Sequence, residues 1–348
     1  MRRVTRAFGW WLATGLAVPA CGTGGDARLY VTVGMGDEAV RLDPRTGNVV
    51  SRIAVDPRPG ESDEPHAVSV APASGFWYVS VAHGEPTLWK FDLATDRLVG
   101  RVPLGTAGAG RVGITPDGRR AFVPDYFRGG GGRRSDVAVV ELHDLQVVAR
   151  LGVCTAPHDA QVDPSGSRVA VACSLSDEIV ILDTDTLAEL ARFYVDATPG
   201  VPGEPRFKPM NLVWAPDGET LYVTLHHAGV VRRFGVGDGR AVGSAATGAG
   251  PGQIAITADG RTLVVPNRED RSVSVVDVRT LRERMRVRID GAHPHGVALA
   301  DDGRTAFVSY EGDTRTQGGV AAIDLETGSV RWRTETGAFT LGVVYARW

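Results

Sequence analysis

The histidines of this 348-residue chain are spaced so that three of them could act together. The dipeptide Pro-His occurs three times, and His66, His158 and His295 each stand just ahead of a short alternating run. Neutral imidazole binds Zn, Cu, Fe or Ni, and imidazole also serves as an acid or a base near neutral pH. If the three converge, they predict a divalent metal site. If they do not, Pro-His is a repeated structural element with no chemistry of its own.

The elements that must position these histidines form an internal repeat. Each unit holds an alternating run, a turn rich in Asp and Gly, and three further short runs with β-branched residues, which predicts four strands. Four strands every 40–50 residues are typical of a β-propeller blade. The residue before the turn recurs at intervals of 44, 48, 52, 42 and 43 residues: Pro72, Pro116, Pro164, Pro216, Ala258 and Asp301.

Six units carry all four strands in order, and the two ends of the chain complete a seventh. Three strand-like runs lie in 28–55, and one more lies in 338–347. Joined, they make one blade from both termini, which closes the ring and leaves no open edge. The sequence therefore predicts an all-β fold, a seven-bladed propeller formed as a single domain by residues 28–348.

The propeller register places most of the candidate residues on one face. The start of each first strand and the end of each second strand lie at the rim of the central channel. Seven of the eight histidines map to this face, and only His143 lies elsewhere. The candidates are His66, His158 and His295 at first-strand starts, Asp125, Asn267 and Tyr310 at second-strand ends, and His83, His226, His227 and His293 close by.

Two cysteines of the predicted propeller also map to this face. Cys154 precedes the fourth unit and Cys173 ends the second strand of that unit. An even pair in an exported protein predicts a disulfide, and the two positions are neighbours in a blade. A metal site that combines cysteine and histidine is the alternative.

The N-terminus predicts export and lipid anchoring. Residues 1–20 hold a basic start and an apolar stretch too short to span a membrane, as in a secretory signal peptide. The sequence "VPAC" resembles the lipobox of bacterial lipoproteins, which implies acylation of Cys21, with residues 21–27 as a tether. The mature chain is then expected at the cell envelope, periplasmic or on the outer surface, held at the membrane surface by lipid.

Composition and missing motifs narrow the function classes. Removal of residues 1–20 takes away three arginines and moves the net charge from −3 to −6, which argues against a nucleic-acid binder. The sequence holds no C-x-x-C-H motif for c-type haem, and neither G-x-S-x-G nor H-E-x-x-H. No cofactor is specified beyond the divalent metal that the histidines suggest.

The repeat resembles that of the YVTN family of bacterial β-propellers. The resemblance rests on "LYVTV" (29–33), "APDGETLYVTL" (215–225), "ADGRTLVVPN" (258–267) and "SVSVVDV" (272–278). It implies a seven-bladed propeller similar to those of lactonase-like and cytochrome d1-like proteins. It implies little about function, because propellers host lactonases, dehydrogenases, haem enzymes and binding scaffolds.

The leading functional hypothesis is a monomeric binding module rather than an enzyme. Its histidine-rich face would bind a small ligand or an envelope protein. The alternative is a metal- or cofactor-dependent hydrolase, lactonase-like, or an oxidoreductase. In that case His66, His158 and His295 would be the ligands. The acid–base groups would come from the same face: Asp125, His83, His226 or Tyr310.

Overall fold

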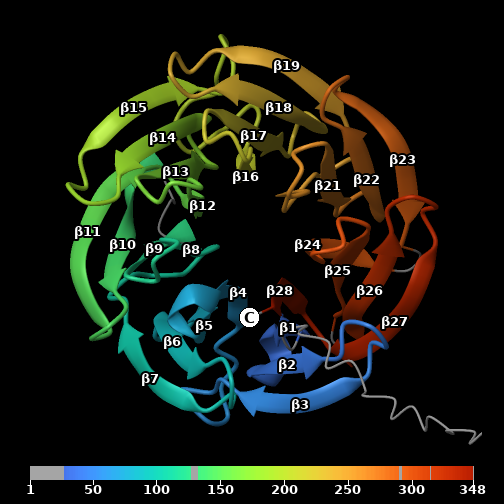
Figure 1. The fold of residues 1–348 in the computed structure, drawn as a ribbon. Coiled ribbons are helices and arrows are strands. Elements are labelled where there is room, and N and C mark those ends of the chain that lie inside the picture. The colour runs from blue at the N-terminus through green and yellow to red at the C-terminus, as the bar shows by residue number, and fades with distance from the viewer. Residues whose placement is uncertain (1–26, 127–131, 290–291, 314, 348) are drawn as a thin grey trace, which may run out of the picture.

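The computed structural model describes residues 27–126, 132–289, 292–313 and 315–347. The predicted signal peptide and Cys21 lie outside these ranges. Seven four-stranded antiparallel sheets are arranged as blades around a central channel (Figure 1). We number the blades 1–7 in the order in which their innermost strands follow one another around the ring, starting with the blade that holds both termini. The predicted fold class and blade count are confirmed.

The blades contain the following strands, innermost first. Blade 1 holds β28 (Thr340–Arg347), β1 (Ala27–Val33), β2 (Glu38–Leu42) and β3 (Val49–Ala54). Blade 2 holds β4 (Pro65–Ala71), β5 (Phe76–Val81), β6 (Thr87–Asp92) and β7 (Leu98–Pro103). Blade 3 holds β8 (Gly113–Ile114), β9 (Arg120–Pro124), β10 (Ser135–Glu141) and β11 (Gln146–Cys154). Blade 4 holds β12 (Pro157–Val162), β13 (Arg168–Cys173), β14 (Glu178–Asp183) and β15 (Glu189–Tyr194).

The remaining blades follow the same order. Blade 5 holds β16 (Pro209–Trp214), β17 (Thr220–Leu225), β18 (Val230–Gly235) and β19 (Ala241–Ala246). Blade 6 holds β20 (Ala255–Ile256), β21 (Thr262–Asn267), β22 (Ser272–Asp277) and β23 (Arg282–Arg288). Blade 7 holds β24 (His293–Leu299), β25 (Thr305–Glu311), β26 (Gly318–Asp324) and β27 (Val330–Gly337). Two short 3-10 turns, Gly34–Gly36 and Pro72–Ser74, follow β1 and β4.

The ring closes as the sequence predicts. The C-terminal strand β28 pairs antiparallel with β1, in a register that sets Ala27 opposite Arg347. Blade 1 is thus built from both ends of the chain, and β28 lines the channel beside β4 and β24 (Figure 1). The described ends of the chain are hydrogen-bonded to each other, which holds the ring together without an open gap between its first and last blades.

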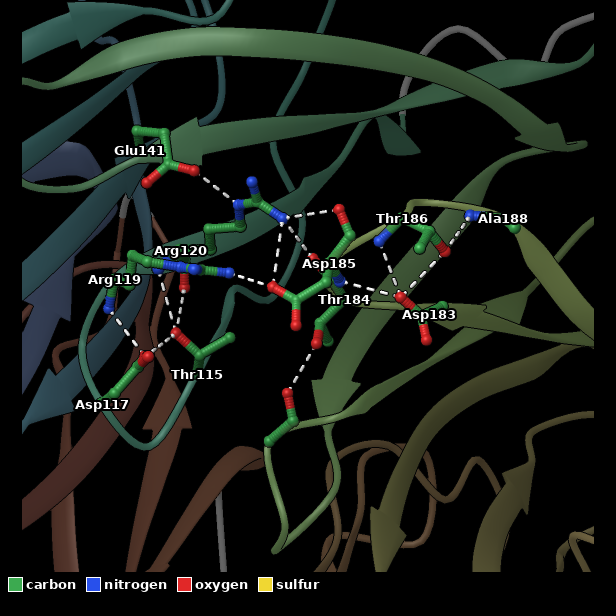
Figure 2. A network of polar contacts seen from close by, with 11 residues as sticks. Thr115, Asp117, Arg119, Arg120, Glu141, Asp183, Thr184, Asp185, Thr186 and Ala188 are labelled. Atoms are coloured by element: carbon green, nitrogen blue, oxygen red, sulfur yellow. Dashed lines mark hydrogen bonds and ion pairs between the residues drawn. The ribbon is translucent and has the colours of Figure 1, made fainter.

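The turns between strands are stabilised by the aspartates that recur in the sequence. Asp183, at the end of β14, accepts hydrogen bonds from the backbone N–H groups of Asp185 and Thr186, and this fixes the hairpin into β15 (Figure 2). Arg120 of blade 3 reaches this same turn and donates to the carbonyl of Thr184 at 2.6 Å while it pairs with Glu141 (Figure 2). These contacts tie neighbouring blades together on the face opposite the histidines.

A buried hydroxyl also joins neighbouring blades near the channel. Thr224 of β17 accepts a hydrogen bond from the N–H of Asn211 in its own blade at 3.0 Å and donates to the carbonyl of Gly252 in blade 6 at 2.8 Å. In three other blades, a side-chain hydroxyl likewise accepts an N–H of its own blade and donates to a carbonyl of the next blade. These hydroxyls belong to Thr32, Ser80 and Ser309.

Replacing Thr224 with valine is expected to lower the free energy of unfolding by about 1–2 kcal/mol, because it leaves a buried N–H and a buried carbonyl without their partner. Urea denaturation followed by fluorescence measures this. Thr262→Val is the matched control, since the Thr262 hydroxyl has no hydrogen-bond partner within the described residues. Equal losses in the two variants would contradict a stabilising relay.

Candidate functional site

Three inner strands bring the Pro-His histidines to one mouth of the channel. The chain adopts a left-handed conformation at Glu64 (φ 55°) and Ala156 (φ 50°), each followed by a proline and then by a histidine. This turn directs the loop between blades into the first strand of the next blade. His66, His158 and His295 occupy equivalent positions at the starts of β4, β12 and β24.

Two of the three histidines form contacts between blades. The Nδ1–H of His158 donates to the carbonyl of Met210 in blade 5 at 2.9 Å. The Nδ1–H of His295 donates to the carbonyl of Leu341 in blade 1 at 3.3 Å. Met210 and Leu341 hold the position that the histidines hold in their own blades, so the contact repeats from blade to blade. In each case Nε2 remains as the acceptor nitrogen of a neutral ring.

His66 departs from this pattern. Among the described residues, the His66 ring makes no hydrogen bond to the equivalent carbonyl in blade 3, that of Gly110, which accepts the hydroxyl of Ser80. The Nδ1 of His66 lies 3.1 Å from Oε1 of Glu64, and Oε2 of Glu64 lies 3.2 Å from Nε2 of His83. The carboxylate therefore bridges two imidazoles, as in sites where an acidic group fixes the orientation of a histidine ring.

The ring of His295 completes this group. Its centroid lies 5.8 Å from that of His66, with the ring planes at 88°. We call Glu64, His66, His83 and His295 the histidine–carboxylate cluster. The His66 side chain is 13% exposed and that of His83 is 43% exposed, so the cluster extends from the channel mouth to bulk solvent.

Burial keeps two of the mouth histidines neutral. Desolvation, together with the charge of His66, lowers the pKa of His158 to about 3, although its bond to the Met210 carbonyl acts in the opposite direction. Desolvation lowers the pKa of His295 to about 4, against the raising effect of the Glu311 carboxylate. Desolvation is the largest influence on the pKa of Glu64 and raises it, but the hydrogen bond from His66 and the charges of the nearby histidines together outweigh it and hold that pKa below its usual range.

These pKa values predict acid sensitivity. An unfolded histidine titrates near pH 6.5, so the unfolded chain takes up these two protons at a higher pH than the folded chain. The stability that neutral His158 and His295 confer is complete above pH 6.5 and is lost as the pH falls toward 4 and then 3. We expect the free energy of unfolding to drop by about 3 kcal/mol between pH 6.5 and pH 5.

Urea denaturation at stepped pH values measures this loss. His158→Gln removes one of the titrating groups and is expected to reduce the slope of stability against pH. The same slope in this variant as in the unchanged chain would show that His158 is not responsible.

Other candidates of the same face lie in smaller clusters around the mouth. His226 donates from Nδ1 to the carbonyl of Pro251, places Nε2 3.3 Å from Oε1 of Glu269, and has His227 as a ring neighbour. His293 donates to the carbonyl of Arg268 at 3.0 Å. These histidines frame the mouth but do not join the histidine–carboxylate cluster.

Three candidates lie inside the blades. Asp125 is fully buried and accepts the N–H of Ala107 at 3.2 Å. Asn267 donates to the hydroxyls of Ser272 and Ser274 within blade 6. Tyr310 packs in the hydrophobic core that blades 6 and 7 share.

Four residues that sequence reasoning did not select also contribute to the mouth. Glu64 bridges two histidines. Glu311 accepts both branches of the Arg268 guanidinium, at 2.9 and 2.6 Å. The ring of Tyr126 meets that of His158 edge-on at 4.4 Å between centroids. Lys208 is the fourth. Like Glu64, it stands immediately before a proline, and this position in the sequence could have pointed to both residues.

The predicted disulfide is confirmed. Cys154 at the end of β11 is bonded to Cys173 at the end of β13, with the two Cα atoms 5.8 Å apart. It joins the outermost strand of blade 3 to the second strand of blade 4.

Within the described ranges, no three His, Cys, Asp or Glu side chains are grouped so that they could hold a metal ion. The ligand set His66, His158 and His295 therefore remains a prediction. The described residues also include no helix long and apolar enough to cross a membrane.

A cavity of about 360 Å³ lies inside the channel. All seven innermost strands contribute to its wall, and most of the lining residues are valine, isoleucine or alanine. The polar side chains among them include Arg111, Gln161 and Gln253. A cavity of this size accommodates a small organic molecule.

Comparisons with known proteins agree with this architecture. A protein family described as "Lactonase, 7-bladed beta-propeller" matches residues 61–340. No curated protein matches the sequence.

Solved structures with similar folds share little sequence with the chain. Hydrazine synthase of Kuenenia stuttgartiensis is 17% identical, with a TM-score of 0.69 over 83% of this chain and 92% of that one. The dihydro-heme d1 dehydrogenase NirN is 15% identical, with a TM-score of 0.64 over 95% and 78%. A functionally unknown protein of Desulfotomaculum acetoxidans is 13% identical, with a TM-score of 0.71 over 92% and 99%. At these identities the likeness concerns the fold alone.

Proposed function

We propose that this chain, which belongs to the lactonase family of seven-bladed β-propellers, binds a small polar organic ligand at the histidine-bearing mouth of its channel. The observation that carries this proposal is the arrangement around His66, which leaves the contact between blades that its counterparts make and pairs with Glu64 instead. A side chain freed from a structural contact, beside a cavity, is suited to contact a ligand.

The chemistry of the mouth favours a ligand rich in hydroxyl groups. His158 and His295 are neutral and present Nε2 lone pairs, because their Nδ1–H groups are used. The Glu64 carboxylate is ionised and adds further acceptor capacity. A group of acceptors requires donors from the ligand, and the hydroxyls of a polyhydroxylated molecule supply them.

Calorimetric titration of the full chain with glucono-1,5-lactone and with gluconate tests the proposal. We expect saturable binding of at least one of them, weakened about tenfold or more in Glu64→Gln and in His66→Gln. His143→Gln is the matched control, because that histidine is 93% exposed and outside the mouth. Binding that is absent, or equal in all variants, would overturn the proposal.

Hydrolysis of a cyclic ester is the second candidate, and the Glu64–His66 pair favours it. His66, oriented through Nδ1 by the carboxylate, would accept a proton from water at Nε2 while the water oxygen adds to the ester carbonyl. The ring C–O bond then breaks, and the leaving alkoxide takes the proton back from His66, so that the product is a hydroxy acid. The neutral base is regenerated and no other reactant is needed.

Titration of the acid released from a lactone measures this activity. We expect His66→Gln to lower kcat by about 100-fold or more, with His143→Gln unchanged. If the unchanged chain hydrolyses the lactone no faster than buffer does, hydrolysis of that lactone is excluded. The binding proposal is then decided by the calorimetric titration alone.

We also propose that the chain is exported and lipid-anchored through Cys21. The basic and apolar character of residues 1–20 and the small residues before Cys21 support it, and the Cys154–Cys173 disulfide is consistent with an oxidising compartment. Metabolic labelling with palmitate should mark the unchanged chain and not Cys21→Ser, which should leave the membrane fraction. An unlabelled unchanged chain would contradict the anchor.

A further inference from the structure

Arg111 places a positive charge in the wall of the channel cavity. The residue precedes β8 in blade 3, and its side chain is about one-quarter exposed. Among the described residues that line the cavity, it is the only charged one, and most of the others are valine, isoleucine or alanine. A charge inside a protein cavity acts more strongly on other charges than it would in bulk water.

Within the described ranges, the protein acceptor near the guanidinium is already well provided with donors. Nη1 of Arg111 lies 3.3 Å from Oδ2 of the buried Asp159. That carboxylate also accepts the side-chain amide of Gln161 at 2.7 Å, the side-chain amide of Asn211 at 3.1 Å and the N–H of Leu212 at 3.0 Å. Asp159 is therefore stabilised largely without Arg111.

Most of the guanidinium remains available to a ligand. An arginine carries five N–H donors in a planar fork that matches two oxygens of one anion. Over the residues that the structure describes, Asp159 is the single side chain within hydrogen-bond distance of Arg111. The remaining donors of the fork thus have no protein acceptor there.

Gln253 of blade 6 supplies a second donor to the same cavity. Its side chain is 7% exposed, and Oε1 accepts the N–H of Val297 at 3.4 Å. This contact fixes which end of the amide faces the protein. Its Nε2 donates to no acceptor in the described part of the chain, and it is not among the buried side-chain atoms there that lack a partner, so it is accessible from the cavity that Gln253 lines.

We propose that the channel interior binds a small oxyanion, a carboxylate or a phosphate group, held by the guanidinium of Arg111 with the Gln253 amide as a second donor. The site is distinct from the mouth, where neutral imidazoles and carboxylates accept hydrogen bonds. It does not depend on the proposed function, because a free anion satisfies its chemistry as well as an acidic group on a larger ligand.

Calorimetric titration of the full chain with sodium phosphate, and separately with sodium acetate, tests this site at an ionic strength held constant with sodium chloride. We expect one equivalent of at least one anion to bind per chain, and Arg111→Gln to weaken it tenfold or more. Binding of phosphate alone indicates a tetrahedral oxyanion, and binding of acetate alone indicates a carboxylate. Arg119→Gln is the control, since that arginine is exposed and pairs with Asp185 on the opposite face.

The design separates this proposal from the others. Arg111→Lys keeps the charge without the fork and is expected to bind more weakly than the unchanged chain. If Arg111→Gln does not fold, two other measurements decide the outcome: the affinity of Arg111→Lys for the anion, and the rise in Tm that the anion gives the unchanged chain. The proposal is overturned if neither anion saturates the unchanged chain, if the arginine variants bind as well as it does, or if His66→Gln rather than Arg111→Gln abolishes binding. Loss of lactone binding alone leaves it intact.

Discussion

Replacing Asp177 with alanine is expected to lower the free energy of unfolding by about 3–5 kcal/mol. The carboxylate is fully buried, and Asp177 is the last residue of the turn between β13 and β14 in blade 4. It accepts backbone N–H groups at 2.8–3.3 Å from four residues of the loop that enters blade 5: Gly200, Arg206, Phe207 and Lys208. Alanine leaves all four donors without their acceptor in a place that water does not readily fill.

The loss is expected to reach the candidate site. The loop that Asp177 holds ends at Lys208, whose φ of 53° turns the chain into β16. Two residues later stands Met210, whose carbonyl fixes the ring of His158. Asp177→Ala should therefore weaken ligand binding at the mouth as well as global stability.

Urea denaturation and the lactone titration measure the two effects. Asp177→Asn is expected to fall between alanine and the unchanged chain, since the amide keeps one acceptor oxygen but turns an NH₂ toward the remaining donors. Asp238→Ala is the control, because Asp238 is an exposed turn aspartate that accepts one N–H. A loss below about 1 kcal/mol for Asp177→Ala would show that the loop finds other acceptors.

The blade count and the ring closure were predictable because they depend on local patterns. Alternation, β-branched residues and Asp-Gly turns recur at a steady interval, and each signal acts within a few residues of the strand that it specifies. The segment "TDTLAELARF" (184–193) shows this well. Its apolar spacing is the most helix-like of the chain, yet its place in the repeat predicts a strand. The first residues of the segment form a turn, and β15 (Glu189–Tyr194) takes up its second half.

The partners of the candidate side chains were less predictable. The repeat brings His66, His158 and His295 to equivalent positions, but the acceptor of each Nδ1 depends on the neighbouring blade and on the residue two positions earlier. The carboxylate of Glu64 can reach its histidine, whereas the methyl group of Ala156 cannot accept a hydrogen bond. Tyr310 ends a second strand, as the histidine-face register requires, and its ring still packs into the core between blades.

Replacing Cys154 and Cys173 together with serine is expected to lower the free energy of unfolding by about 3 kcal/mol. The bond closes a loop over a sequence separation of 19 residues, and a loop of that length restricts the unfolded chain by about this amount. Both cysteines are buried in the core of blades 3 and 4. The serine hydroxyls would lie in a largely apolar place, which adds to the loss.

The same pair controls the approach to His158. Cys154 ends β11, and Thr155 and Ala156 then carry the chain to Pro157 and His158. With the bond present, this short segment is tied at its start by the disulfide and at its end by the contact of His158 with Met210. Without it, the segment is held at one end only, so ligand affinity at the mouth should fall together with stability.

Urea denaturation with and without dithiothreitol measures the contribution. We expect the reductant to shift the midpoint of the unchanged chain toward that of the double serine variant and to leave the variant itself unaffected. A variant as stable as the unchanged chain would show that the bond adds nothing to the fold. A loss near 3 kcal/mol would instead make the domain markedly less stable in a reducing compartment. The stability of the fold would then depend on oxidising surroundings, which are those that the proposed export would provide.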